Sequence, residues 1–194
     1  MKFTNRQTEI ILAATELIGD GGVQKLTTKK LAAKMGFSEP ALYRHFRDKN
    51  DILRSILLYF KGAMGSGLKH VLIDDSDGMT KLRKIIRYQF DFFVQYPAVI
   101  MVIFSETSFQ DNKRLSVTVK NILDEKRHIV KEIIYAGQKD GSIRSDVDAD
   151  QLTSIIMGSM RVTVLNWRLH GFDFDLKKEG EKLLETMTTL LAVE

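Results

Sequence analysis

Apolar residues recur along much of this chain at intervals of three or four positions, the spacing of an α-helix with one apolar side. In residues 5–19 that side consists of Ile10, Ile11, Ala14, Leu17 and Ile18. The same periodicity predicts helices over residues 29–35, 39–46, 49–71, 80–95, 98–107, 116–138, 148–169 and 175–191. Because only two prolines interrupt these patterns, we expect an all-α fold of about nine helices.

Glycines and short polar segments separate the predicted helices. Glycine readily adopts the left-handed conformation that ends a helix, and glycines follow residues 20, 35 and 140. Oxygen-bearing side chains stand where helices begin, and can accept hydrogen bonds from free backbone N–H groups there. These expected caps are Thr27 or Thr28, Ser38, Asp48 and Asp148, and the clearest loop covers residues 74–78.

Two of the predicted helices, 29–35 and 39–46, are short and joined by a tight bend that contains Gly36. This arrangement matches a helix-turn-helix, in which the second helix enters the major groove of DNA. Ala32 is small where the two helices would cross, and Leu42 would anchor the second helix. The predicted DNA contacts are Thr27, Thr28, Ser38, Glu39, Pro40, Ala41, Tyr43, Arg44, His45 and Lys49.

Several of these residues have a second interpretation. Glu39 can accept a hydrogen bond from a cytosine amino group, or it can simply complement the positive end of its helix. Tyr43 and Lys49 suit contacts with the DNA backbone, but a core aromatic and a solvated lysine are the alternatives. His45 suits a phosphate contact and equally an ordinary surface position.

The positive charge of the chain lies in its first third. Residues 1–60 contain ten Lys and Arg against six Asp and Glu, whereas residues 61–194 contain nineteen of each. A positive head on a neutral body favours contact with a polyanion such as nucleic acid.

Further motif elements fall at fixed mutual spacing along residues 5–60. They are Ile11-Leu12-Ala13-Ala14, Thr27-Thr28, Phe37 after Gly36, and Leu42-Tyr43-Arg44-His45-Phe46 followed by Lys49 and Leu53. Together they resemble the DNA-binding head of the TetR family of bacterial regulators. The resemblance implies a DNA-binding domain at 1–47, an effector-binding and dimerisation domain at 48–194, and a palindromic double-stranded DNA operator. The family often has a small or basic residue and a glycine where this chain has Glu39-Pro40, so the operator sequence does not follow.

Aromatic and methionine side chains in the body suit an apolar effector cavity, although the same residues also suit a plain core. Arg161 lies on an otherwise apolar helix, where it can orient an acidic ligand or lie at a subunit interface. The predicted effector-binding residues are Tyr88, Phe92, Met101, Phe104, Tyr135, Met157, Arg161 and Trp167. The expected effector is a small apolar or amphipathic molecule.

The last two predicted helices are the candidates for a homodimer interface. Gly158 and Ser159 lie in the middle of helix 148–169, where small side chains allow close approach of another helix. Helix 175–191 carries a leucine stripe almost to its end. Pairing both helices with their symmetry mates would build a four-helix interface, and a dimer is what a palindrome requires.

Other classes of function are disfavoured. The chain has no cysteine, which excludes disulfides and thiolate chemistry and fits a reducing cytoplasm. Its four histidines are scattered without metal-ligand spacing, and no catalytic motif is present, so we expect no enzyme, metal or cofactor. No apolar run reaches 18 residues and the first residues lack a signal-peptide stretch, so we expect no membrane segment and a cytoplasmic location.

The sequence therefore predicts a DNA-binding transcriptional regulator, with a repressor released by a small ligand as the leading hypothesis. The alternative is a DNA-bound dimer controlled by a protein partner, without a small-molecule effector.

Overall fold

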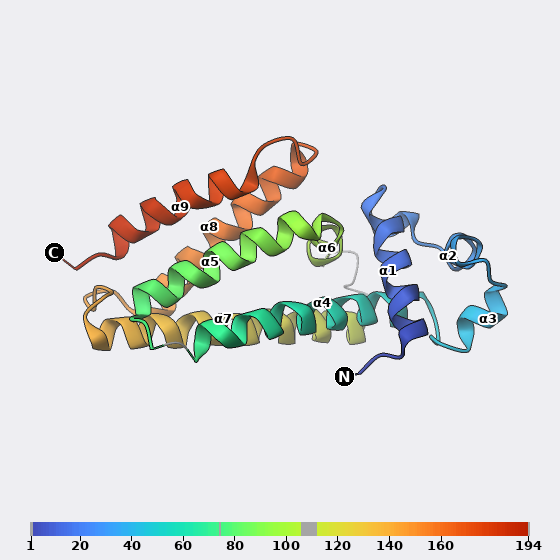
Figure 1. Cartoon of the computed structure of the whole chain (residues 1–194), viewed down its shortest axis with the longest axis horizontal. Coiled ribbons are helices and arrows are strands. Elements are labelled where there is room, and N and C mark those ends of the chain that lie inside the picture. The colour runs from blue at the N-terminus through green and yellow to red at the C-terminus, as the bar shows by residue number, and fades with distance from the viewer. Residues whose placement is uncertain (1, 74, 106–111, 194) are drawn as a thin grey trace. The chain divides into compact units, whose positions relative to one another are not determined.

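The computed structural model describes residues 2–73, 75–105 and 112–193. Over these residues the chain forms nine α-helices and one short 3-10 helix, with no strand. The all-α prediction is therefore confirmed (Figure 1). The elements are α1 (Asn5–Gly19), η1 (Val23–Lys25), α2 (Thr28–Met35), α3 (Glu39–Tyr43), α4 (Lys49–Leu72), α5 (Gly78–Gln95), α6 (Pro97–Ile103), α7 (Lys113–Asp140), α8 (Ala149–Leu169) and α9 (Leu176–Leu191).

Most predicted helix ends agree with the structure because the expected caps form. The side chains of Thr27 and Asp148 accept hydrogen bonds from backbone N–H groups at the starts of α2 and α8. Gly36 and Gly141 both adopt positive φ where their helices end. Ser38 occupies the N-cap position of α3, but its side chain makes no capping hydrogen bond, so that part of the prediction is wrong.

Three helices differ from the predicted ranges by three residues or more at one end, and the others by no more than two. The recognition helix α3 ends at Tyr43 rather than Phe46, whereas α7 extends beyond residues 116–138 at both ends. Helix α6 ends at Ile103, and the last residues of the predicted range 98–107 lie outside the described residues. The short helix η1 was not predicted.

The chain divides into two compact units that are discontinuous in sequence. Unit 1 contains Met1–Ala63 and Tyr96–Ile122, and unit 2 contains Met64–Gln95 and Leu123–Glu194. Helices α4 and α7 each contribute to both units. The units therefore group α6 with the N-terminal helices. The predicted domains, 1–47 and 48–194, are continuous in sequence, and their boundary stays a prediction.

In unit 1, α1 is the central helix and packs on both α2 and α6. Its apolar side is fully buried through Ile10, Ile11 and Ile18. At its end Gly19 allows a close approach, because a Cβ there would lie 3.2 Å from the Cβ of Ala98 in α6. The α1–α6 contact makes residues far apart in sequence part of one core.

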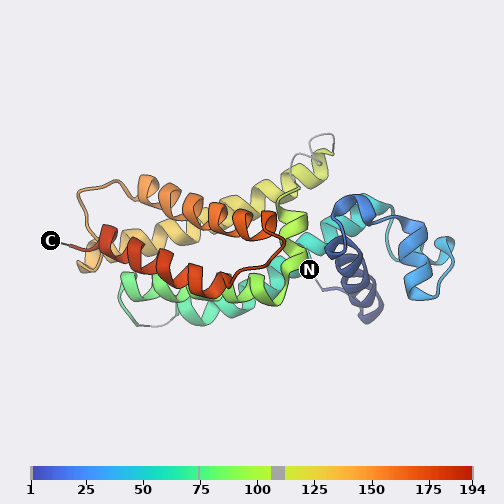
Figure 2. The ribbon, with the colours of Figure 1, turned by 90° about the horizontal axis from the view of Figure 1, so that it is seen from above.

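In unit 2, α9 packs along α5 and α8, as Figures 1 and 2 show. Glycines permit the closest contacts. A Cβ at Gly180 of α9 would lie 2.6 Å from the ring of Phe90 in α5, and a Cβ at Gly78 would lie 2.3 Å from the Cα of Gly137 in α7. The guanidinium of Arg87 also binds the Glu181 carboxylate through two hydrogen bonds of 2.7 and 2.8 Å.

Candidate nucleic-acid interface

The bend between α2 and α3 has the geometry of a helix-turn-helix. Gly36 adopts a left-handed conformation at φ 67° and ψ 30°, which glycine accepts without a steric penalty. The next amide, of Phe37, donates a 2.8 Å hydrogen bond to the Ala32 carbonyl. Leu31 and Leu42 are both fully buried, and α2 packs against α3.

Helix α3 has one buried and one exposed side. Leu42 points into the core of unit 1, whereas the neighbouring Tyr43 leaves 48% of its surface exposed. Arg44 and Pro40 are exposed as well, and His45 is half-buried. The predicted outward surface of the recognition helix is therefore available for contact with DNA.

The first turns of α2 and α3 are joined by a side-chain hydrogen bond. The Thr28 hydroxyl donates to Oε2 of Glu39 over 2.7 Å. Glu39 lies in the first turn of α3, where a carboxylate also interacts favourably with the helix dipole. Thr28 and Glu39, both predicted DNA contacts, therefore hold each other in position. The sequence pattern did not indicate this hydrogen bond.

Helix α1 contacts the segments that precede and follow the recognition helix. The side-chain amide of Gln7 donates a 3.3 Å hydrogen bond to the carbonyl of His45. The guanidinium of Arg6 lies 4.3 Å from the ring centroid of Phe37, within the range of a cation–π contact. Both ends of the segment from Phe37 to His45 are therefore tied to α1.

Lys49 is the first residue of α4, and the cap of this helix is well formed. Oδ1 of Asp48 accepts the backbone N–H of Asp51 over 2.8 Å, as the sequence predicted. The Lys49 side chain is half-buried, and this burial lowers the pKa of its amino group. An ammonium that has lost part of its hydration at a helix N-terminus suits a phosphate oxygen.

The predicted effector-binding residues are divided between the two units. Met101 and Phe104 belong to unit 1, and the other six belong to unit 2. Tyr88 packs so closely on α4 that a Cβ at Gly67 would overlap its ring, and its ring centroid lies 6.4 Å from that of Phe92. The structure therefore gives Tyr88 a packing role beside any role in ligand binding.

Trp167 closes the turn between α8 and α9. Its indole N–H donates a 2.8 Å hydrogen bond to the carbonyl of Phe174, and its ring makes an edge contact with Phe172 at a centroid distance of 4.8 Å. Phe172 has a positive φ of 64°, which is unusual for a bulky residue and costs energy that this contact helps to offset. The buried position of Trp167 is thus accounted for by the turn.

The remaining predicted effector residues are less buried. Half of the Tyr135 surface is exposed, with the amino group of Lys139 over its ring at 4.5 Å. Met157 is half-buried and Arg161 is exposed. Lys126, which sequence reasoning missed, lies close enough to Arg161 for their charges to interact. Burial, together with repulsion from Arg161, lowers the pKa of Lys126 to about 8.

In the part of the chain that the structure describes, several apolar residues of α8, and one near the end of α9, are largely exposed. Ile155 and Val162 are 54% and 56% exposed, and Leu169 and Leu190 are more exposed still. Between Ile155 and Val162, Gly158 has no described atom within 4 Å of the position that a Cβ would occupy. We call Ile155, Gly158, Val162 and Leu169 the α8 face.

Among the described residues, no group of three or more His, Cys, Asp or Glu side chains is placed to hold a metal ion. No described helix is long and apolar enough to cross a bilayer.

The fold and the exposed recognition helix define a helix-turn-helix DNA-binding regulator. Residues 10–56 match the family model of bacterial regulatory proteins of the tetR family, and residues 61–191 match that of the YsiA-like protein C-terminal region. The chain therefore belongs to the TetR family, which confirms the family resemblance seen in its sequence.

Relatives and solved structures agree with this assignment. The nucleoid occlusion factor SlmA of Photobacterium profundum is 27% identical over 164 residues, which cover 82% of this chain and 84% of SlmA. The fatty acid degradation regulator FadR of Bacillus halodurans superposes with a TM-score of 0.83 at 19% identity and 97% coverage of both chains. Bacillus subtilis FadR in complex with stearoyl-CoA is 25% identical, with a TM-score of 0.78, and covers 93% of this chain and 97% of its own.

Proposed function

We propose that this protein is a transcriptional repressor that binds a palindromic operator as a homodimer and is released by a small amphipathic ligand. The observation that carries the DNA-binding part is the exposed side of α3, with Tyr43 and Arg44 outward and Lys49 at the start of the next helix. A regulator of this kind acts in the compartment that holds the chromosome, and we assign it no catalytic role.

The α8 face supports the dimer. In a helix interior glycine costs about 1 kcal/mol relative to alanine, and no described atom of its own chain requires Gly158 to be small. A partner helix that approaches closely at this point explains both the glycine and the exposed apolar residues around it. We therefore place the interface on α8 and α9, with the two recognition helices brought to successive major grooves.

Two observations support an anionic amphiphile as the effector. Bacillus subtilis FadR, which is similar along nearly the whole chain, was solved in complex with stearoyl-CoA. In unit 2, burial and the nearby charge of Arg161 lower the pKa of Lys126. A negatively charged ligand group beside Lys126 would favour the charged form of its amino group. We therefore propose a long-chain acyl thioester or a fatty acid as the ligand class.

The similarity to SlmA favours a second candidate function. SlmA is named as a nucleoid occlusion factor and is similar over 82% of this chain. In this alternative the protein binds DNA as a dimer and is controlled by a protein partner, with no small-molecule effector.

Fluorescence anisotropy with the DNA upstream of the protein's own gene tests the proposal. We expect sequence-specific binding that weakens steeply with salt, because phosphate contacts release counterions. Stearoyl-CoA should weaken binding to that DNA at least tenfold, and coenzyme A without the acyl chain should not. Absence of sequence-specific binding would refute the repressor. Specific binding that no acyl thioester or fatty acid alters would favour the partner-controlled alternative.

A further inference from the structure

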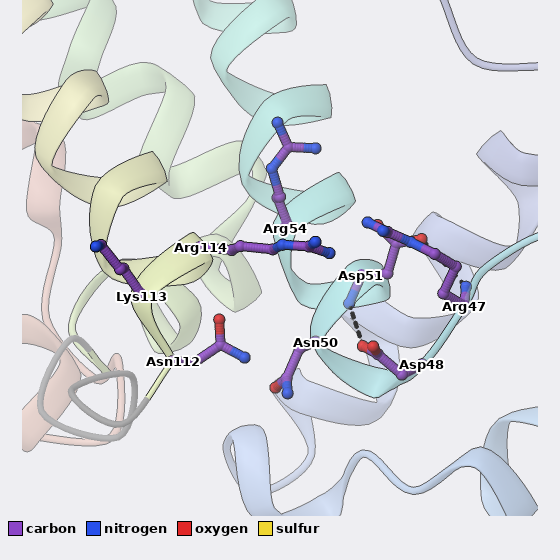
Figure 3. Close-up of a pocket in the computed structure, with 8 residues that line it drawn as sticks. All are labelled: Arg47, Asp48, Asn50, Asp51, Arg54, Asn112, Lys113 and Arg114. Carbon is purple, nitrogen blue, oxygen red and sulfur yellow. Dashed lines mark hydrogen bonds and ion pairs between the residues drawn. The ribbon is translucent and has the colours of Figure 1, made fainter.

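A polar hollow of about 320 Å³ lies in unit 1, between the first turns of α4 and α7. Its walls are formed chiefly by Arg47, Asp51 and Arg54 from the α4 side and by Asn112, Lys113 and Arg114 from the α7 side. Arg114 extends from α7 toward α4, as Figure 3 shows. The volume falls at the lower end of the range for small-molecule sites, but the walls are charged rather than apolar.

The acidic residues of the hollow already have partners. Asp48 accepts the backbone N–H of Asp51. The Asp51 carboxylate accepts the backbone N–H of Arg47 at 3.1 Å and the Arg47 guanidinium at 3.4 Å. Asn112 caps α7, because its Oδ1 accepts the backbone N–H of Leu115 at 3.1 Å. These groups are therefore occupied with the two helix starts.

Three cations in the hollow have no such partner. The side chains of Arg54, Lys113 and Arg114 form no hydrogen bond or ion pair with another described residue. Arg54 is only partly exposed. Figure 3 shows Arg114 extending toward the α4 side, on which Arg54 lies, whereas the Lys113 amino group points away from α4. Like charges that line one hollow repel one another. The arrangement gains stability when an anion enters.

We propose that this hollow binds a small molecule that carries two adjacent phosphate groups. One phosphate has at most two negative charges near neutral pH and leaves three cations incompletely balanced, whereas a diphosphate matches them. Arginine binds phosphate oxygens through paired N–H groups, and two arginines and one lysine supply donors from both sides. A DNA backbone is the competing occupant, but a concave site between two helix starts fits a compact ligand better than the outer edge of a duplex.

Isothermal titration calorimetry on the full-length protein tests this site with inorganic pyrophosphate as the probe. Sodium chloride of equal ionic strength is the reference. We expect saturable binding of pyrophosphate to the wild type, with inorganic phosphate at least tenfold weaker. Arg54→Gln and Arg114→Gln should each weaken pyrophosphate at least tenfold. Lys120→Gln removes one charge from the same helix α7 outside the hollow and should leave binding within twofold.

Three results would overturn the proposal. Pyrophosphate that binds no better than chloride excludes the site. Equal binding by Arg114→Gln and Lys120→Gln shows a general charge effect rather than a site. Loss of DNA affinity in both arginine variants, without any pyrophosphate binding to the wild type, assigns these cations to the DNA backbone. The proposal does not depend on the repressor function, because pyrophosphate binding is measured without DNA and without an acyl ligand.

Discussion

The hydroxyl of Thr28 is bonded to Oε2 of Glu39, so that the helix before the turn and the recognition helix begin from a shared polar contact. The other carboxylate oxygen of Glu39 has no hydrogen bond to a described residue. The same side chain can therefore hold the turn through one oxygen and accept from a cytosine amino group through the other. The two interpretations that the sequence left open for Glu39 are compatible in this geometry.

A double-mutant cycle of Thr28→Val and Glu39→Ala measures this contact. Each single change should lower the free energy of unfolding by about 0.5–1.5 kcal/mol, because it removes one side-chain hydrogen bond. The pair should cost less than the sum of the single changes, which urea denaturation can detect. Glu39→Ala combined with Lys29→Ala is the control and should be additive. Additive effects in the Thr28 pair would mean that the bond does not contribute.

Tyr43→Phe and Lys49→Ala test the proposed contacts with the DNA backbone. Both should weaken binding to specific and unrelated DNA by the same factor, since phosphate contacts carry no sequence information. Lys49→Ala should also reduce the slope of log K against log salt by about 1. Lys182→Ala, a surface charge on α9, serves as the control. A change in sequence preference without a change in salt slope would contradict the assignment of Lys49.

Val162→Arg tests the α8 face as the dimer interface. Val162 is 56% exposed within its own chain, so the change should alter the stability of the monomer by no more than about 0.5 kcal/mol. An arginine buried against a partner helix without a counter-charge is costly, and analytical ultracentrifugation should therefore report a monomer. Val117→Arg places the same charge at an exposed site on α7 and should remain dimeric. A dimeric Val162→Arg variant would move the interface elsewhere.

Lys126 gives the stability a predictable dependence on pH. Its pKa is about 8 in the folded protein, below the 10.5 of an unperturbed lysine. Between these values the unfolded chain holds more protons, so stability should rise with pH through this window. Below pH 8 the buried amino group is charged, and the cost of burying that charge lowers the free energy of unfolding by up to about 3 kcal/mol.

Lys126→Met should therefore stabilise the protein at pH 7 and flatten the rise toward pH 10, as followed by urea denaturation across this range. The exposed Lys120→Met on the same helix is the matched control. If the stability of the wild type and that of the Lys126→Met variant change by the same amount between pH 8 and pH 10, the pKa of Lys126 is not lowered.

The features that the sequence predicted correctly are local ones. Thr27, Gly36 and Asp148 act on backbone groups within a few residues, so their positions in the sequence are enough to place helix ends. The early end of α3 was missed: after Tyr43 the amides of Arg44 and His45 bond to carbonyls three residues back, and the carbonyl of His45 accepts from Gln7, which is 38 positions away. Patterns of apolar residues do not contain that information.

Contacts between distant helices explain the other omissions. Gly78 of α5 lies close to Gly137 of α7. From the sequence alone, neither can be told apart from a glycine that ends a helix. Lys126 looks like an ordinary surface charge until the fold buries it beside Arg161, and Arg114 does so until the fold places it in the wall of the hollow. The sequence predicted Leu42 as the inward anchor of the recognition helix, but it left a core position open for Tyr43, which the structure shows to be 48% exposed.

The packing of α6 on α1 has a consequence for engineering. Hybrid regulators are built by joining the head of one protein to the body of another, and the natural cut in sequence lies soon after the recognition helix. Here a fragment cut there leaves behind α6, which supplies Ala98 against Gly19 and the buried Val99 and Ile100. A transplanted head would carry an exposed apolar surface on α1, so a functional graft has to include α6 or a redesigned substitute for it.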